Sequence, residues 1–155
     1  MKNLKNNQSG FTLIEILVVI GMIALLAAIV LIAINPARQF AQGRNTQRTS
    51  NTNAILNAVG QFTADNKGNL PTVPAKGAAA VEIGVNLCND LVPTFLPSLP
   101  TDPSSSKKGE SITTCADAVA GAVGYTVAQD NSGRITIAAP NTEIPPATVI
   151  ISTTR

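Results

Sequence analysis

The feature that most constrains this chain is an apolar run near its amino terminus. Residues 16–34 contain no charged side chain, and a helix of roughly 19 such residues is long enough to cross the hydrocarbon core of a bilayer. A polar segment with Lys2 and Lys5 precedes the run, and one carboxylate, Glu15, stands immediately before it. The sequence therefore predicts a single membrane-spanning helix with an acidic residue at its start.

Glu15 is the unexpected member of this segment. The Ile, Leu and Val residues of the run contribute on the order of −6 kcal/mol to membrane insertion, and an ionised residue costs roughly 2.5–3.5 kcal/mol at the helix centre and less near an end. Insertion is thus favourable even with Glu15 charged. A carboxylate in this position indicates a functional partner of positive charge. The α-amino group of Phe11, created by a cut after Gly10, would supply it.

The stretch Gly-Phe-Thr-Leu-Ile-Glu at residues 10–15, followed by a long apolar helix, resembles the class III signal of type IV pilins and of type II secretion pseudopilins. In that family a prepilin peptidase cuts after the glycine, here Gly10, and methylates the new terminal residue, here Phe11. The acid, here Glu15, is held to pair with the Phe11 amine of a neighbouring subunit. The resemblance implies the following partners: copies of the chain in a helical filament, the prepilin peptidase, an assembly platform with minor pilins, and membrane lipid before assembly.

Two simpler interpretations explain less of this segment. A secretory signal peptide has an apolar region of about 7–15 residues followed by an A-x-A-like cleavage site, whereas here the run is longer and Asn35-Pro36 follows it. A plain single-span anchor explains the run but neither Glu15 nor the Gly10–Phe11 junction.

The helix is expected to continue beyond the membrane as a spine. Pro36 removes one backbone donor and clashes with the preceding turn, which predicts a kink or a short unwound stretch over residues 32–36. Gly68 is suited to a left-handed cap at the end of the helix. We expect four regions: a leader at 1–10, a transmembrane and assembly helix at 11–35, an amphipathic half of the spine at 36–68, and a globular head at 69–155.

The second half of the spine has one apolar face, with Ile55, Val59 and Phe62 at helical spacing. This face is expected to cover a sheet. Arg44 and Arg48 lie one turn apart, either on a solvated helix face or where they could meet phosphates or neighbouring subunits.

Three strands are expected in the head, all in its carboxyl-terminal part. Residues 124–129 and 134–138 alternate apolar and polar side chains around a turn at 130–133, and residues 147–153 form the third strand. A short helix is expected near 86–91. The proline-dense segment 93–103 cannot be helix interior or central strand, and it resembles an L-x-x-L-P-x-D-P segment of major pseudopilins. The predicted fold is α+β, a long spine helix packed on a small three-stranded antiparallel sheet, as in the pilin roll.

Cysteine content, the lack of histidine and the net charge limit the functions that this chain can have. Cys88 and Cys115 are the two cysteines, and an even count in an outward-facing domain predicts one disulfide, with two buried thiols as the alternative. The absence of histidine excludes a His-based triad or His metal site, and no catalytic, cofactor or metal constellation is visible. Without Lys2 and Lys5, nine basic and nine acidic residues remain, which argues against nucleic-acid binding.

The sequence taken alone predicts a structural subunit rather than an enzyme. The expected role is a type IV pilus-like filament subunit, inserted in the cytoplasmic membrane as a precursor and then assembled at the cell surface. One alternative is the major pseudopilin of a type II secretion system. Another, of a different class, is a membrane-anchored binding domain that never polymerises.

Overall fold

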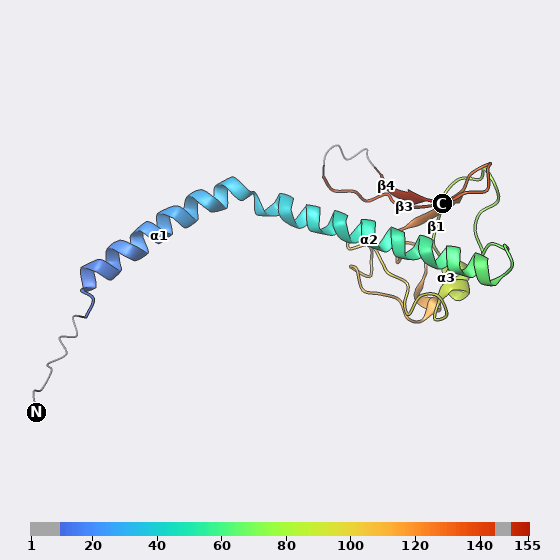
Figure 1. The fold of residues 1–155 in the computed structure, drawn as a ribbon, viewed down its shortest axis with the longest axis horizontal. Helices are drawn as coiled ribbons and strands as arrows, with labels where there is room; N and C mark the ends of the chain where they lie inside the picture. The colour runs from blue at the N-terminus through green and yellow to red at the C-terminus, as the bar shows by residue number, and fades with distance from the viewer. Residues whose placement is uncertain (1–9, 145–149) are drawn as a thin grey trace, which may run out of the picture. The chain divides into compact units, whose positions relative to one another are not determined.

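The computed structural model describes residues 10–144 and 150–155, and the chain divides into two compact units, residues 1–39 and residues 40–155 (Figure 1). Most of the expected leader, residues 1–9, lies outside the described residues, and so do residues 145–149.

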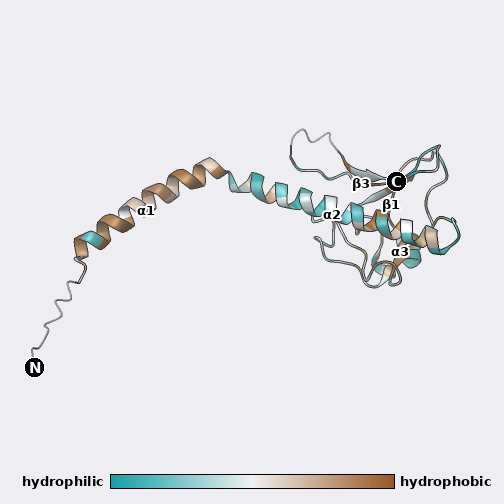
Figure 2. Ribbon diagram, viewed as in Figure 1, coloured by the Kyte–Doolittle hydropathy of each residue, from teal (hydrophilic) through white to brown (hydrophobic). Residues whose placement is uncertain are grey.

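The first unit is dominated by the apolar helix α1 (Leu13–Ile34). Figure 2 shows hydrophobic residues along almost its whole length, and none of its side chains is buried within the protein. Among the described residues, α1 is the one helix that is long and apolar enough to cross a membrane. The long apolar helix predicted from residues 16–34 is therefore present.

A break at Asn35 separates α1 from the next helix, α2 (Pro36–Asp65). Asn35 adopts a left-handed conformation (φ 47°, ψ 82°), which asparagine tolerates better than most residues. Its backbone oxygen accepts a hydrogen bond from Arg38 N at 3.1 Å. Pro36 follows as the first residue of α2, where a missing N–H costs least. The break falls inside the range 32–36, where the sequence predicts a kink.

The second unit, residues 40–155, combines most of α2 with the globular part that follows it, and we call this whole unit the head. It has its own hydrophobic core. The inner face of α2 contributes Ile55 and Val59, which are 0% and 3% exposed and belong to one buried cluster with strand residues such as Ile137. Phe62 packs edge-on against Phe95, with ring centroids 5.6 Å apart. The apolar face expected from helical spacing thus packs in the core of the head.

A four-stranded antiparallel sheet completes the core, with strand order β1-β2-β3-β4. The strands are β1 (Val81–Glu82), β2 (Thr126–Gln129), β3 (Ile135–Ala139) and β4 (Ile151–Thr154). β2 and β3 form the predicted hairpin, and Gly133 takes the left-handed conformation in its turn (φ 88°). β4 continues past the expected end of the third strand, while residues 147–149 of that expected strand lie outside the described residues.

The sheet has one strand more than the three expected, because β1 adds a fourth. β1 is only two residues long and has no alternating pattern of its own. It exists through its pairing with β2, where Val81 lies opposite Val127 and Glu82 opposite Thr126. Such a strand is specified by its partner rather than by its own sequence.

A disulfide joins two short helices of the head. Cys88 in helix α3 (Val85–Leu91) is bonded to Cys115, which begins the short 3-10 helix η1 (Cys115–Asp117). The two residues are 27 positions apart in the chain, and their Cα atoms lie 5.5 Å apart. The predicted disulfide is confirmed, and the alternative of two free thiols is excluded.

Candidate functional site

The Gly10–Phe11 junction lies outside any helix. Both residues are exposed and precede α1, and the Phe11 side chain is 85% exposed. A Cβ atom built on Gly10 would meet no other atom within 4 Å. The backbone on either side of the expected cleavage point is therefore non-helical and open to approach by another protein.

Thr12 and Glu15 form a reciprocal cap at the start of α1. The Thr12 hydroxyl oxygen accepts a hydrogen bond from Glu15 N at 3.3 Å, and Glu15 Oε2 accepts one from Thr12 N at 2.7 Å. The Thr12 hydroxyl also donates to Oε2 at 2.7 Å. This is a capping box, in which a Thr and a Glu three residues later satisfy backbone donors at the amino end of a helix.

Apolar side chains lie next to the exposed Glu15 on the surface of α1. Phe11, Ile14, Val18 and Met22 line a shallow hollow on the helix surface together with Glu15. A carboxylate in this setting receives little hydration once the helix is in lipid or packed against other helices, and it then depends on protein donors and cations. Among the described residues, Thr12 is the one that donates hydrogen bonds to the Glu15 carboxylate.

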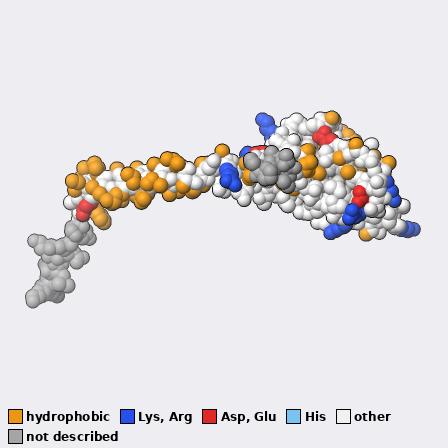
Figure 3. Space-filling model, turned by 90° about the horizontal axis from the view of Figure 1, so that it is seen from above, with side chains coloured by type: hydrophobic (Ala, Val, Ile, Leu, Met, Phe, Trp, Pro, Cys, Tyr) orange, Lys and Arg blue, Asp and Glu red, His pale blue; other side chains and the backbone are white. Residues whose placement is uncertain are grey.

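The surface of α1 is apolar and exposed. The exposed fraction of its large side chains runs from 45% for Val18 to 84% for Ile32. Hydrophobic side chains cover the face of the helix that is seen in Figure 3. An exposed apolar surface of this extent is unfavourable in water and marks a site of interaction with another apolar surface.

A cluster of charged residues lies in the head, apart from the Glu15 site. Arg48 on α2 and Asp102 are each 0% exposed and form a two-point ion pair, with Nε to Oδ2 at 2.8 Å and Nη2 to Oδ1 at 3.1 Å. Burial alone would raise the pKa of the Asp102 carboxyl, but hydrogen bonds from Arg48 and Ser104 outweigh it, and the pKa lies below its usual value.

Glu143 joins this cluster from the carboxyl-terminal part of the chain. Its carboxylate accepts hydrogen bonds from Arg44 and, at 2.8 Å, from Arg48 Nη2. The bonds from Arg44, opposed by partial burial and reinforced by Arg48, lower the pKa of Glu143 to about 2. Two arginines and two carboxylates thus connect α2 to two distant loops and neutralise one another.

The expectation of a solvated helix face is wrong for Arg48, whereas Arg44 stays partly exposed, with 41% of its side chain accessible. A solvated helix face does not fit a fully buried Arg48, and a site for phosphates or neighbouring subunits does not fit two guanidinium groups that already pair within the head. Their partners lie 54 to 99 positions away in the chain, so helical spacing alone could not reveal them.

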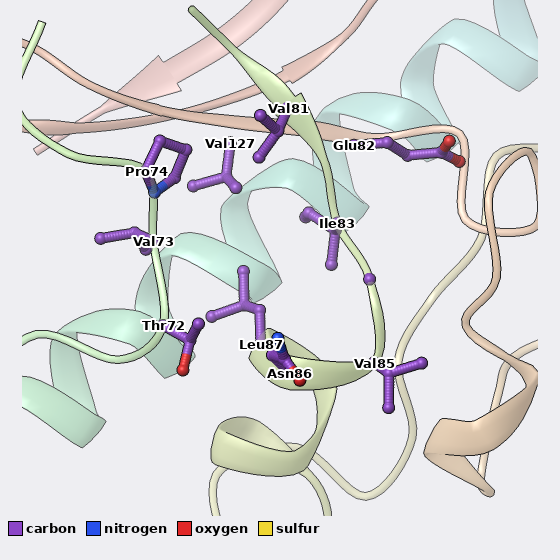
Figure 4. Close-up of a pocket in the computed structure, with 11 residues that line it drawn as sticks. Thr72, Val73, Pro74, Val81, Glu82, Ile83, Val85, Asn86, Leu87 and Val127 are labelled. Carbon is purple, nitrogen blue, oxygen red and sulfur yellow. The ribbon is translucent and has the colours of Figure 1, made fainter. Parts of the chain in front are cut away.

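The head also contains a small pocket of about 330 Å³ (Figure 4). Its lining is mainly apolar, with Val73, Val81, Ile83 and Leu87 among the side chains that surround it. Within residues 10–144 and 150–155, no group of three or more Asp, Glu or Cys side chains could hold a metal ion.

The residues expected to carry function fall into three places. Gly10, Phe11 and Glu15 come together at the start of α1, Pro36 begins α2, and the two cysteines form the disulfide of the head. Sequence reasoning did not assign a role to Thr12, although the Thr-x-x-Glu spacing at residues 12–15 is itself the signal for a capping box.

Comparison with known protein families agrees with the geometry of this segment. Residues 5–31 match the family described as "Prokaryotic N-terminal methylation motif". Searches of curated proteins and of solved structures returned no match. The one match covers part of the leader, the Gly10–Phe11 junction and most of α1, and it does not extend to the head.

The chain therefore carries the amino-terminal signal of type IV pilins and pseudopilins. This motif and the apolar helix fit a pilin-like precursor that enters a membrane. In general the motif implies processing by a prepilin peptidase and self-assembly, and it points to a structural protein.

Proposed function

We propose that this chain is a structural subunit of a type IV pilus-like filament. It is made as a membrane-inserted precursor, cut after Gly10, and polymerised through α1. The observation that carries the proposal is the exposure of α1 along its whole length, with no buried residue and one carboxylate at its start. The described part of the chain does not bury the apolar surface of this helix. Lipid, or copies of the same helix, would bury it.

Processing at Gly10 prepares the chain for assembly. The peptidase releases the leader and leaves Phe11 as the new terminal residue, which it then methylates on the α-amino group. The exposed, non-helical backbone at Gly10 and Phe11 supports access to this bond. The cut also places a new positive charge four residues before Glu15.

Assembly transfers α1 from lipid into a bundle of like helices. The transfer keeps the apolar surface out of water, so the hydrophobic term is retained while packing contacts are gained. An unpaired Glu15 would be costly within the bundle, because a charge in an apolar medium is unfavourable unless it meets an opposite charge. Pairing with the Phe11 amine of a neighbouring copy would favour one axial register.

The proposed partners and location follow from this mechanism. The precursor lies in the cytoplasmic membrane as a single-pass protein, in contact with lipid and the prepilin peptidase. An assembly platform and minor pilins then act on the mature chain, which ends as a filament at the cell surface. The head, which has a disulfide, suits an oxidising exterior.

Replacement of Glu15 tests the mechanism. Glu15→Ala should insert into the membrane and be processed like the unaltered chain, because the apolar run and the Gly10–Phe11 junction are intact. The filament yield after shearing should fall at least about tenfold, as expected when a charge-assisted contact is lost. Asp65→Ala, which removes an exposed carboxylate at the end of α2 and outside the apolar helix, is the control. A normal filament yield from Glu15→Ala would rule out the register role.

A type II secretion pseudopilin is the second candidate. The segment 96–103 favours it, since it resembles a segment of major pseudopilins and is a structural part of the head, with Leu99 and Asp102 both 0% exposed. Deletion of the gene distinguishes the two: loss of surface filaments indicates a pilus, and retention of exported proteins inside the cell indicates a secretion system.

A further inference from the structure

The two hydrogen bonds that Thr12 makes to Glu15 end on the same carboxylate oxygen. Thr12 N and the Thr12 hydroxyl both donate to Oε2 at 2.7 Å. Within residues 10–144 and 150–155, no donor lies within hydrogen-bond distance of Oε1. The carboxylate is therefore held on one side and open on the other.

Helix capping alone does not require this arrangement. An N-cap residue satisfies the helix by accepting a bond from a backbone N–H, which the Thr12 hydroxyl oxygen does for Glu15 N. The additional bond from the hydroxyl hydrogen to Oε2 serves the carboxylate instead. It restrains the rotation of a flexible side chain and stabilises its negative charge by a charge-assisted bond.

We propose that Thr12 is a positioning residue for assembly, which fixes Oε2 and leaves Oε1 as the acceptor for the α-amino group of Phe11 in a second copy of the chain. This inference rests on the proposed function, since it assumes that Glu15 meets that amine in the filament. It adds that the Glu15 carboxylate is oriented before the neighbour arrives, so that less conformational entropy is lost when the contact forms.

The proposal predicts how three substitutions at Thr12 differ. Thr12→Ser keeps the hydroxyl as donor and acceptor and should assemble normally. Thr12→Val has nearly the same shape but loses both roles of the hydroxyl. Thr12→Gly also loses the hydroxyl, yet glycine is tolerated as an N-cap with little loss of helix stability. A purely structural cap would therefore be disturbed by Val and barely by Gly, whereas a positioning role is lost in both.

A double-mutant cycle with Glu15→Gln separates positioning from capping. Glutamine can still form a capping box with Thr12, but it carries no charge for the amine. If Thr12 acts through the Glu15 carboxylate, Thr12→Val should lower assembly in the unaltered chain and have little further effect in the Glu15→Gln background. If Thr12 is only a cap, Thr12→Val should lower assembly by the same factor in both backgrounds.

The experiment uses the full chain in cells that also make the unaltered chain, so that filaments form in every sample. Mass spectrometry of peptides that contain the substitution gives the ratio of variant to unaltered chain in sheared filaments, divided by the same ratio in the membrane. We expect this incorporation ratio to fall about tenfold for Thr12→Val and for Thr12→Gly, the loss typical of a hydrogen bond to a charged group. Thr12→Ser should stay within about twofold of the unaltered chain.

The outcomes separate this inference from the proposed function. Equal effects of Thr12→Val in the two backgrounds, or normal incorporation of Thr12→Val, would overturn the positioning role while the filament itself remains established. Filaments that lack the chain altogether, or a chain that keeps its leader, would instead overturn the proposed function. The amino-terminal peptide of each variant is measured in the same samples, so that a defect in processing is not mistaken for a defect in assembly.

Discussion

The two units of this chain differ in the exposure of their large apolar side chains. Ile23 in α1 is 59% exposed, whereas Ile55 in α2 is 0% exposed and lies in the core of the head. α1 is stabilised by its own backbone hydrogen bonds and its Thr12–Glu15 cap, and no described part of the chain buries its side chains. The head buries a contiguous apolar core and adds a disulfide and a buried ion-pair cluster.

This difference in exposure separates the contacts that stabilise the head from those that α1 makes with its surroundings. The head contains the contacts that determine its fold, so changes to its core should alter its stability. The surface of α1 is complementary to something outside the chain, so changes there should alter insertion or assembly and leave the head unaffected. The following predictions test this division, in order of decreasing expected effect.

The largest effect is expected from Arg48→Met. The substitution leaves the buried Asp102 carboxylate without a cationic partner, which typically destabilises a protein by about 3–5 kcal/mol. The unfolding of the head can be followed in detergent solution by the near-ultraviolet signal of Tyr125, the one tyrosine of a chain that has no tryptophan. Arg38→Met, at an exposed position of the same helix, is the control. Equal denaturation midpoints for the two variants would show that the ion-pair cluster does not stabilise the head.

Removal of the disulfide should have the next largest effect. The bond between Cys88 and Cys115 closes a loop of 27 residues, and the chain-entropy relation assigns about 3–4 kcal/mol to a loop of this length. The variant with both cysteines changed to alanine should unfold at correspondingly lower denaturant concentration, measured as above. An unchanged midpoint, with the bond verified by intact mass in the parent protein, would refute this contribution.

The direct contrast between the units is a pair of matched isoleucine substitutions. Ile55→Ala should destabilise the head by about 3 kcal/mol, since it leaves a cavity in a closely packed core. Ile23→Ala shortens the same side chain on α1 and should change the stability of the head by less than about 0.5 kcal/mol, as for other exposed positions. A comparable loss of head stability from both variants would mean that the two units are not independent.

The smallest effect concerns acid pH and Glu143. Its pKa is lowered to about 2 and that of Asp102 is lowered too. Their contribution is therefore fully present above the unfolded-state pKa values near 4 and is lost as the pH falls toward about 2. Glu143→Gln should destabilise the head at pH 7 by about 1–2 kcal/mol, since one of its arginine partners is partly exposed. It should also flatten the decline of the denaturation midpoint between pH 5 and pH 2.

Local features of the sequence allowed much of this structure to be predicted. The apolar run specifies α1, the dipeptide Asn35-Pro36 specifies the break after it, and the turn at residues 130–133 specifies the hairpin. α2 ends at Asp65, and Gly68 takes the left-handed conformation expected of a helix-ending glycine. Each of these features depends on residues that are close together in the chain.

The features that sequence reasoning missed depend on residues that are far apart. β1 is a strand because it meets Val127 and Thr126, about 45 positions later. Arg48 is buried because Asp102 and Glu143 neutralise it, and an arginine on a helix normally predicts an exposed face. Thr12 is a different case, since its capping pattern is local and could have been recognised from the residues alone.

The central claim is that this chain is cut between Gly10 and Phe11 and then assembled through α1. The most direct measurement is the amino-terminal peptide of the protein in filaments sheared from the cell surface, determined by mass spectrometry. The account predicts a peptide that begins with Phe11 and carries a methyl group on its α-amino nitrogen. A peptide that begins at Met1, or one that begins beyond Ile34, would contradict it and would leave the chain as an anchored or secreted domain that does not polymerise.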